Sequence, residues 1–323
     1  MQKYVYGVDI GGTNIKYGLF SIPKMEMIQK YENETPTTNH ETSVFQLVAD
    51  TICMMNEKNK IDISQIEGVG IAVPCPVKNG YVEKCPNLKW QKIDIYSEMN
   101  KYLPRRIKIA VSNDANIAAY GENQILDTPH RNAVFYTLGT GVGGGIIIDG
   151  EILEGRTGAG GEIGHMHVFE GTEPCSCGLS GCLEQICGTN AILRQTKEFS
   201  LMYPTRLNLE KLTVKDVFDY AKAGDIVAMK VVDKIGEYMA ISASILSVSL
   251  DPDIFIIGGG VSKAGDILID TIKKHYKKHA RFSTGDIPFT LAKTGNDAGI
   301  IGAANYVNMK RINITNVGAR DKT

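Results

Sequence analysis

The sequence predicts an α/β protein built from mixed sheets and packed helices. Apolar segments of strand length alternate with segments whose apolar residues recur at helical spacing. Three of the predicted strands run directly into a glycine cluster, and 34 of the 323 residues are glycine. A chain of this length is expected to form about two domains, each large enough to bury a hydrophobic core.

The first part of the chain is predicted to begin with a β-hairpin and to continue with alternating helices and strands. Residues 4–10 and 15–20 flank a Gly-Gly turn, which is typical of a hairpin. Residues 41–58 carry apolar side chains at helical spacing. An apolar segment at 67–73 predicts a buried strand, which two nearby prolines end. The next expected elements are a strand at 107–111 and an alanine-rich helix at 114–124.

The second part repeats the combination of an apolar strand with a glycine cluster. Residues 133–138 and 145–149 are expected to be strands on either side of a glycine run. Residues 155–190 are rich in glycine and cysteine and show little periodicity, which predicts a loop region held by something other than a core. The remaining expected elements are helices at 214–248, a strand at 253–257, and helices at 262–278 and 297–308.

The charge balance argues against nucleic acid and membrane partners. The chain has 35 Lys and Arg against 36 Asp and Glu, a formal net charge of −1. No basic surface is therefore expected to bind nucleic acid or an anionic membrane. No apolar stretch reaches the ~18 residues of a membrane span, and Asp9 interrupts the N-terminus before a signal-peptide core could form. Seven cysteines are too few for a disulfide scaffold, so we expect a cytoplasmic protein.

The first glycine cluster has the composition of a phosphate-binding turn. Gly11 and Gly12 permit a close approach of the backbone to a ligand, and successive N–H groups in such a turn attract anions. Thr13 adds a hydroxyl and Lys16 a positive charge. Asp9, at the end of a buried strand, is placed to hold Mg²⁺ directly or through water. The alternative is a plain hairpin turn beside a solvated aspartate.

Two further glycine clusters are candidates for the same polyphosphate or nucleotide. The run at 138–145 is followed by a strand rather than a helix, and no Gly-Lys-Ser/Thr closes it, so it matches neither a Rossmann nor a Walker A motif. The third cluster follows a strand and is expected to open a helix, whose N-terminus favours anions. Tight turns without a ligand are the alternative for both. The residues concerned are Gly139, Thr140, Gly141, Gly258, Gly259 and Gly260.

Three cysteines and a histidine form a complete ligand set for a structural metal. His165, Cys175, Cys177 and Cys182 offer one imidazole and three thiolates, which suit tetrahedral Zn²⁺. Four protein ligands leave no open position, so the metal would be structural. His167 is an alternative to His165, and reduced cysteines in a metal-free loop are the alternative to the whole site.

Five motifs together resemble the ROK family of sugar kinases and repressors. They are DIGGTNIK at 9–16, SNDANIAAYGE at 112–122, LGTGVGGG at 138–145, GEIGH at 161–165 and CSCGLSGCLE at 175–184. The resemblance extends from residue 5 to about 308, and within the family it is greatest to bacterial ATP-dependent glucokinases. The combination is specific, although a single glycine run would not be.

The resemblance implies an actin/hexokinase-like (ribonuclease H-like) two-domain fold with a cleft between the domains. One domain is expected to comprise residues 1–118 and 300–323 and to hold the first phosphate motif. The other, residues 119–299, would hold the second phosphate motif, the zinc loop and the adenosine loop. A homodimer or homotetramer is expected by analogy with the family.

The same resemblance assigns a role to each site residue. Asp114 resembles the catalytic base, and an aspartate at a helix start is otherwise a common N-cap. The three glycine clusters would bind ATP with Mg²⁺, the third around its adenosine. The expected sugar-binding residues are Asn87, Asn113, Asp114, Glu162, His165 and Glu184.

The activity implied is ATP-dependent phosphorylation of a hexose at its 6-hydroxyl, with glucose as the first expectation. Fructose, mannose, allose and N-acetylmannosamine remain alternatives, because Cys75 stands where the family usually has glycine near the sugar. A non-catalytic sugar-sensing regulator is the remaining alternative. Such repressors carry an N-terminal helix-turn-helix, for which the first motif at Asp9 leaves no room.

Overall fold

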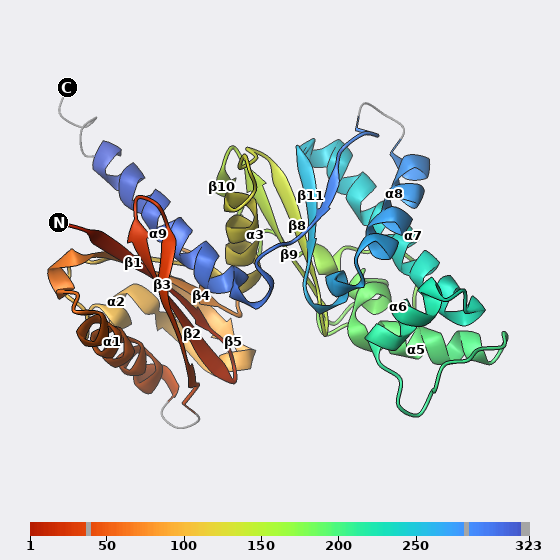
Figure 1. Cartoon of the computed structure of the whole chain (residues 1–323), viewed down its shortest axis with the longest axis horizontal. Coiled ribbons are helices and arrows are strands. Elements are labelled where there is room, and N and C mark those ends of the chain that lie inside the picture. Colours follow the sequence, from red (N-terminus) through yellow and green to blue (C-terminus); the bar gives the residue numbers. More distant parts are fainter. Residues whose placement is uncertain (37–39, 281–283, 318–323) are drawn as a thin grey trace. The chain divides into compact units, whose positions relative to one another are not determined.

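A computed structural model describes residues 1–36, 40–280 and 284–317, and these form two compact units (Figure 1). Unit 1 comprises Met1–Thr128, Ile152–Gly160 and Asn296–Thr323, and unit 2 comprises Pro129–Glu151 and Gly161–Gly295. The last six residues of the predicted first domain, 318–323, lie outside the described residues.

The first unit extends beyond the expected boundary at residue 118 because of one helix pair. Residue 118 lies inside α3 (Asp114–Gln124), which packs along α9 (Ala298–Val317). A Cβ added to Gly302 would come within 2.0 Å of the Ile117 carbonyl oxygen, so the two backbones are almost in contact. This contact keeps α3 whole within unit 1.

Unit 1 is built on a five-stranded sheet in the order β3-β2-β1-β4-β7. β1 (Lys3–Ile10), β2 (Asn14–Ile22) and β3 (Glu26–Glu34) pair antiparallel, which confirms the predicted hairpin. β4 (Ile66–Val73) and β7 (Lys108–Asn113) continue the sheet in parallel with β1. The other elements of this unit are α1 (His40–Asn59), η1 (Ile63–Gln65), β5 (Tyr81–Cys85), η2 (Pro86–Leu88), β6 (Trp90–Asp94), α2 (Ile95–Met99) and η5 (Gly295–Asp297), which begins on the last residue of unit 2.

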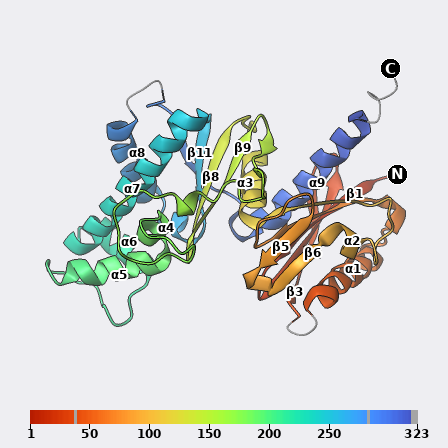
Figure 2. The ribbon, with the colours of Figure 1, turned by 180° about the vertical axis from the view of Figure 1, so that it is seen from behind.

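Helices α1 and α9 cover opposite faces of this sheet (Figures 1 and 2). Successive side chains of a strand point to opposite faces, and β1 shows both. Tyr6 points toward α1, where its hydroxyl donates to Asn56 Oδ1 at 2.9 Å. Gly7 faces α9, since a Cβ there would lie 1.9 Å from the Ile300 carbonyl oxygen. The missing side chain lets α9 lie directly on the sheet.

Gly70 on β4 makes the same close approach, and its replacement by alanine is expected to destabilise unit 1. A Cβ at Gly70 would lie 1.8 Å from the Ala303 carbonyl oxygen, so the helix would have to move. We expect a loss of about 1–3 kcal/mol or more, measured by urea unfolding. Gly260→Ala is the control, because nothing lies within 4 Å of its added Cβ. Equal stability of the two variants would contradict this packing.

Unit 2 repeats the strand order of unit 1 in a second five-stranded sheet, β10-β9-β8-β11-β12. β8 (Ala133–Leu138) pairs antiparallel with β9 (Val142–Ile148), and β10 (Glu151–Ile152) follows at the edge. β11 (Ile254–Gly258) and β12 (Phe289–Leu291) continue in parallel. Both sheets thus begin with a hairpin whose turn is a glycine cluster. This shared arrangement explains why the combination of an apolar strand and a glycine cluster recurs in the sequence.

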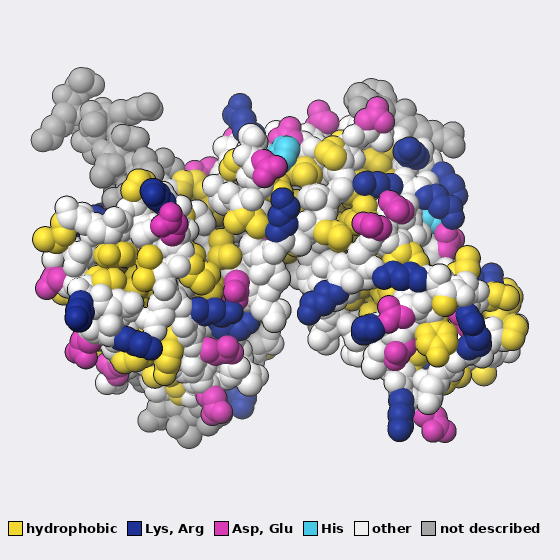
Figure 3. Space-filling model, in the orientation of Figure 1, with side chains coloured by type: hydrophobic (Ala, Val, Ile, Leu, Met, Phe, Trp, Pro, Cys, Tyr) yellow, Lys and Arg dark blue, Asp and Glu magenta, His cyan; other side chains and the backbone are white. Residues whose placement is uncertain are grey.

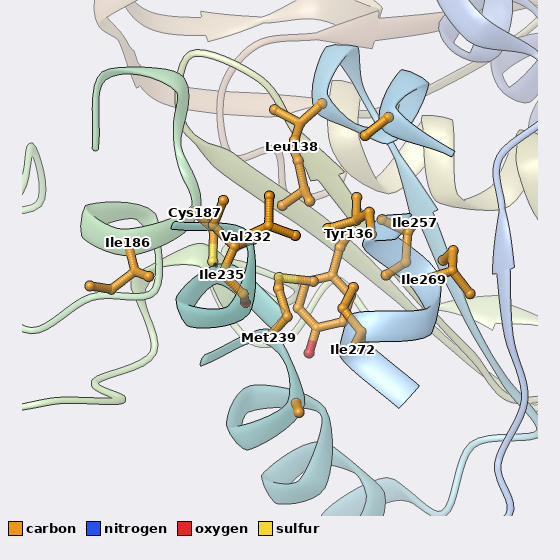
Figure 4. Close-up of a cluster of buried hydrophobic side chains, with 14 of the residues drawn as sticks. Tyr136, Leu138, Ile186, Cys187, Val232, Ile235, Met239, Ile257, Ile269 and Ile272 are labelled. Atoms are coloured by element: carbon orange, nitrogen blue, oxygen red, sulfur yellow. Dashed lines mark hydrogen bonds between the residues drawn. The ribbon is translucent and has the colours of Figure 1, made fainter. Parts of the chain in front are cut away.

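The helices of unit 2 bury a single apolar cluster against this sheet (Figure 4). Tyr136, Leu138 and Ile257 extend from the strands toward the long helix α7 (Ile226–Leu250), which has buried residues along most of its length. Ile186 and Cys187 reach the same cluster from the short helix α4 (Glu184–Cys187). The other helices are η3 (Ile163–His165), α5 (Thr189–Ser200), α6 (Val214–Lys222), η4 (Gly260–Ala264) and α8 (Asp266–His279).

Charged side chains of both signs are scattered over the visible face (Figure 3). Among the described residues, no helix combines the length and the apolar character that crossing a membrane requires.

Candidate functional site

The first glycine loop is a tight turn between β1 and β2 whose outer residues are exposed. Gly11 N donates to Asn14 O at 2.9 Å, and the buried Thr35 binds the carbonyl oxygen of Gly11 through its hydroxyl at 2.7 Å. Gly12 and Thr13 remain exposed. A Cβ on Gly12 would lie 3.1 Å from Asn87 O, so this loop lies against the segment that carries Asn87.

Asp9 is a half-buried residue at the end of β1, and its carboxylate lies beside the first turn of α9. A Cβ on Gly299 would lie 2.5 Å from Asp9 Oδ2. Burial raises the pKa of Asp9, and the charge of Lys16, its register partner on β2, opposes this shift. A divalent cation would compensate the lost hydration, and carboxylate oxygens are ligands that Mg²⁺ prefers. The residue and its place beside the loop fit a magnesium ion.

Asp114 occupies the first position of α3, and the neighbouring Asn113 caps the helix. Asn113 Oδ1 accepts from Ala115 N at 2.9 Å and from Asn116 N at 3.1 Å. The alternative that Asp114 itself serves as the N-cap is therefore wrong. Its half-buried carboxylate accepts from Ala115 N at 2.8 Å, and the helix dipole favours negative charge at this position.

Asn113, an expected sugar ligand, has both ends of its amide engaged within unit 1. Its oxygen caps α3, and its Nδ2 donates to the carbonyl oxygen of Cys75 at 3.4 Å. Any bond to a sugar would therefore share these atoms or compete for them.

Cys75, the departure from the family pattern, turns its sulfur into the core of unit 1. Cys75 and Cys85 are both buried, and their thiols are hydrogen-bonded to each other. This bond, together with burial and the charge of Asp114, raises the pKa of Cys75, whereas the same bond lowers the pKa of Cys85. Cys85 Sγ also lies 3.7 Å from Pro74 O. The added side chain is thus accommodated by a thiol partner.

The second glycine loop, residues 138–142, is hydrogen-bonded to the first residue of α5 (Thr189–Ser200). Thr189 donates to Gly139 O through both its backbone N and its hydroxyl, each at 2.8 Å. Gly139 N closes the turn on Gly141 O at 2.9 Å, and Thr140 is exposed. The loop is therefore fixed at Gly139 and accessible to solvent at Thr140.

The third cluster packs directly on this loop. Gly259 has φ +83°, and a Cβ there would lie 2.3 Å from Leu138 O. β8 and β11 are parallel neighbours, so their carboxyl ends meet at one edge of the sheet. The predicted helix at 262–278 is wrong at its start, because η4 (Gly260–Ala264) intervenes and α8 begins at Asp266. The glycine φ and the η4 turn bend the chain before that helix can form.

A cavity of about 240 Å³ opens beside the third cluster. It has apolar and charged walls from η4, α6 and the start of α5, and its size and lining suit a flat heteroaromatic group. Its α6 residues belong to no sequence motif, so the sequence does not predict them as site residues. The lining residues are Thr189, Val214, Lys215, Phe218, Asp219, Gly260, Val261, Lys263 and Ala264.

The predicted metal ligands come together in unit 2. The ligand atoms of His165, Cys175, Cys177 and Cys182 all lie within 4.8 Å of one another. Cys177 Sγ and Cys182 Sγ are 3.6 Å apart, and Cys175 Sγ lies 3.4 Å from His165 Nδ1. These separations match the ~3.8 Å between ligands of a tetrahedral zinc with 2.3 Å bonds.

The alternative ligand, His167, lies outside this cluster. Its Nδ1 is 3.1 Å from Ser180 O, and its Nε2 is 3.7 Å from Glu170. His165 instead directs Nδ1 at the cluster, which leaves Nε2 for another partner.

The two expected glutamates of unit 2 differ in their surroundings. Glu162 is exposed at the start of η3. Glu184 is half-buried at the start of α4 and touches both the second glycine loop and the cysteine cluster: Oε2 accepts from Val142 N at 3.0 Å, and Oε1 lies 3.7 Å from Cys175 Sγ. The sequence places both glutamates near the cysteine cluster but gives no sign of the link to the loop.

The sequence-predicted site residues thus fall into one set in each unit. Unit 1 carries the first glycine loop with Asp9, Lys16, Asn87, Asn113 and Asp114, and unit 2 carries the other two glycine clusters with Glu162, Glu184 and the metal ligands.

Comparison with known proteins gives consistent matches along the whole chain. The sequence profile of the ROK family matches residues 5–310. A glucokinase of Halalkalibacterium halodurans is 36% identical, over 93% of this chain and 94% of that protein. A glucokinase of Thermotoga maritima is 33% identical, over 93% and 96%.

A solved structure supports the same assignment. The ROK family glucokinase from Streptomyces griseus, in complex with glucose and AMPPNP, superposes with a TM-score of 0.72 and 28% identity, over 95% of this chain and 99% of that one. The actin/hexokinase-like two-domain fold is thereby confirmed. With its three glycine clusters, its cysteine cluster and an end-to-end profile match, the chain belongs to the ROK family.

Proposed function

We propose that this protein transfers the γ-phosphoryl group of ATP to the 6-hydroxyl of a hexose, with glucose as its preferred substrate. The observation that carries the proposal is Asp114, a carboxylate released from capping by Asn113 in the same unit as the first glycine loop. The relatives named glucokinase and the glucose and AMPPNP complex support the choice of substrates. The test is a panel of hexoses with ATP and Mg²⁺, in which glucose should give the highest kcat/KM.

In this reaction Asp114 accepts the proton of the attacking hydroxyl. Phosphoryl transfer relies on positioning and on neutralising charge, with a base placed at the nucleophile. Lys16 and the backbone N–H groups of the exposed residues Gly12 and Thr13 would bind the phosphates. Asp9 would hold Mg²⁺, which supplies charge neutralisation when bound.

The nucleotide is proposed to lie along the glycine clusters of unit 2. Gly139, Thr140 and Gly141 bind phosphate oxygens, and the adenine occupies the cavity of about 240 Å³ beside Gly258, Gly259 and Gly260. Phe218 and Val261 offer apolar surface to the ring. Contact between Gly259 and Leu138 supports a continuous nucleotide site.

The sugar is proposed to bind Asn87, Asn113, Glu162, His165 and Glu184. Carboxylates accept paired hydrogen bonds from neighbouring hydroxyls, as a hexose offers. The metal of the cysteine cluster is proposed to be structural Zn²⁺, with His165 Nε2 left to reach the sugar.

The quaternary structure and location are further parts of the proposal. We expect a cytoplasmic homodimer or homotetramer, without nucleic acid or membrane partners. Sedimentation velocity at micromolar concentration measures the oligomeric state directly, and a monomer would contradict the proposed assembly.

Glu162→Gln is expected to weaken sugar binding and to leave nucleotide binding unchanged. Losing a charged acceptor costs roughly 1.5–3 kcal/mol per hydrogen bond, so the KM for glucose should rise about 10–100-fold. The KM for ATP should change less than about twofold, because Glu162 lies outside the glycine clusters proposed to bind the nucleotide. Glu170→Gln is the matched control, because it removes an exposed acid of the same segment, one that lies 3.7 Å from His167 Nε2. An unchanged glucose KM in Glu162→Gln would remove this residue from the sugar site.

A further inference from the structure

The carboxylate of Glu184 joins two parts of unit 2 that the sequence treats as separate motifs. Its Oε2 accepts from Val142 N at 3.0 Å, at the point where the second glycine loop enters β9. Its Oε1 lies 3.4 Å from Ser176 Oγ and 3.7 Å from Cys175 Sγ, inside the cysteine segment. One side chain therefore contacts both a predicted phosphate loop and a predicted metal ligand.

The glycines around this contact leave little freedom for the carboxylate. A Cβ on Gly141 would lie 2.0 Å from Glu184 Oε2, so a residue larger than glycine would displace the carboxylate. A Cβ on Gly188 would lie 2.9 Å from Thr140 O, which brings the end of α4 against the loop as well. Helix α4, which directly follows the cysteine segment, thus packs against Thr140 and Gly141 of the second glycine loop.

The backbone on either side of Glu184 is itself fixed. Its carbonyl oxygen accepts from Gly188 N at 3.0 Å, and Thr189 then binds Gly139 O. Ile186 and Cys187 are buried in the apolar cluster beside Val232 and Ile235 (Figure 4). Glu184 therefore presents its carboxylate to the loop from a rigid support, as a positioning residue must.

We propose that Glu184 is a positioning residue that ties the metal-ligating segment to the second glycine loop, so that the metal site supports nucleotide affinity. The inference rests on the proposed function and deepens it, because it gives the cysteine cluster a role beyond folding. The Val142 N–H and the hydroxyl of Ser176, which lies between two metal ligands, donate to the two oxygens of one carboxylate, so a displaced cysteine segment also releases the loop. Hydrogen bonds to a charged carboxylate are stronger than those between neutral groups.

Two substitutions of Glu184 are expected to differ in their effect on nucleotide binding. In Glu184→Gln the amide oxygen can still accept from Val142 N, whereas Glu184→Ala leaves that N–H without its partner. We expect the Kd of a non-hydrolysable ATP analogue, measured by calorimetry without sugar, to rise about tenfold in Glu184→Ala and less than about threefold in Glu184→Gln, since about 1.4 kcal/mol corresponds to each factor of ten. A sugar ligand alone would leave this Kd unchanged in both variants.

Hydrogen–deuterium exchange provides a readout that does not depend on activity. The peptide containing residues 138–145 should exchange faster in Glu184→Ala than in the parent protein and should regain protection in Glu184→Gln. Glu173→Gln is the matched control, because it removes an acid of the same segment that pairs with Arg194 at 3.3 Å. Its nucleotide Kd and its exchange should match the parent.

The contribution of the metal is tested on the whole protein. Each variant is assayed for zinc by elemental analysis, and only variants that keep the parent's metal content report on the carboxylate. Parent protein depleted of metal by a chelator should bind the analogue about tenfold more weakly and show faster exchange at 138–145. Equal nucleotide affinity in Glu184→Ala and the parent, or in depleted and loaded protein, would overturn the inference. A parent protein that binds no nucleotide would instead refute the proposed function.

Discussion

Replacing Asp114 by asparagine is expected to reduce kcat by about 10²–10⁴, the usual contribution of a general base. The amide keeps the shape of the side chain but cannot take the proton from the 6-hydroxyl. The fold should survive, because Asn113 provides the cap of α3. The dipole of α3 loses one favourable charge, which costs only about 0.3–1 kcal/mol of stability.

The measurement is initial-rate kinetics with glucose and ATP, together with glucose binding by calorimetry. Glucose affinity should change by no more than a few-fold, as expected for a group that acts on the transition state. Asp127→Asn is the control, an exposed acid just beyond α3 that should keep the parent's kcat. Retention of a tenth or more of the parent's kcat in Asp114→Asn would show that another group is the base.

Elements with strong local signals were predictable from the sequence. The helix at 114–124 matches α3 to the residue, and the hairpin at 4–10 and 15–20 matches β1 and β2 with small extensions. Both elements have clear boundary signals in the sequence. A capping asparagine begins the helix, and a Gly-Gly turn joins the two strands of the hairpin.

Elements that lack a clear alternating pattern, or whose apolar face depends on tertiary packing, were missed. β3 has an exposed pattern with charged residues at many positions, so no alternation marks it as a strand, and it forms by pairing with β2. β5 and β6 are short and pair only with each other. α5 follows the cysteine segment directly, and its buried face depends on packing against α7.

The candidate site shows the same division. The motif residues form the predicted turns and the predicted close set of ligands, because a glycine turn or a close set of ligands is encoded within a few positions. Thr189, Phe218 and Lys215 line the proposed nucleotide cavity without any motif, since α5 and α6 reach it only through tertiary packing. The partner of Cys75 was equally hidden, because Cys85 approaches it through the β5–β6 hairpin.

Cys177→Ser is expected to remove the metal and to destabilise unit 2 by several kcal/mol. Cys177 is exposed, and an exposed cysteine without a metal can be replaced at a cost within about 0.5 kcal/mol. Binding of a structural zinc, by contrast, contributes about 10–16 kcal/mol in small zinc domains, and a serine hydroxyl replaces a thiolate ligand poorly. A large effect at an exposed position therefore identifies the metal as its cause.

The experiment compares Cys177→Ser with Cys53→Ser, a second exposed cysteine that lies on α1 in unit 1. Elemental analysis should find about one zinc per chain in the parent and in Cys53→Ser, as one four-ligand set implies, and much less in Cys177→Ser. Thermal unfolding should show a lower Tm only in Cys177→Ser, and chelation should lower the Tm of the parent toward the same value. If both variants kept the parent's Tm and the parent carried no metal, the four side chains would be a cluster of reduced thiols beside a histidine. The segment 175–184 would then owe its shape to its own turns and to the anchoring of α4 in the core.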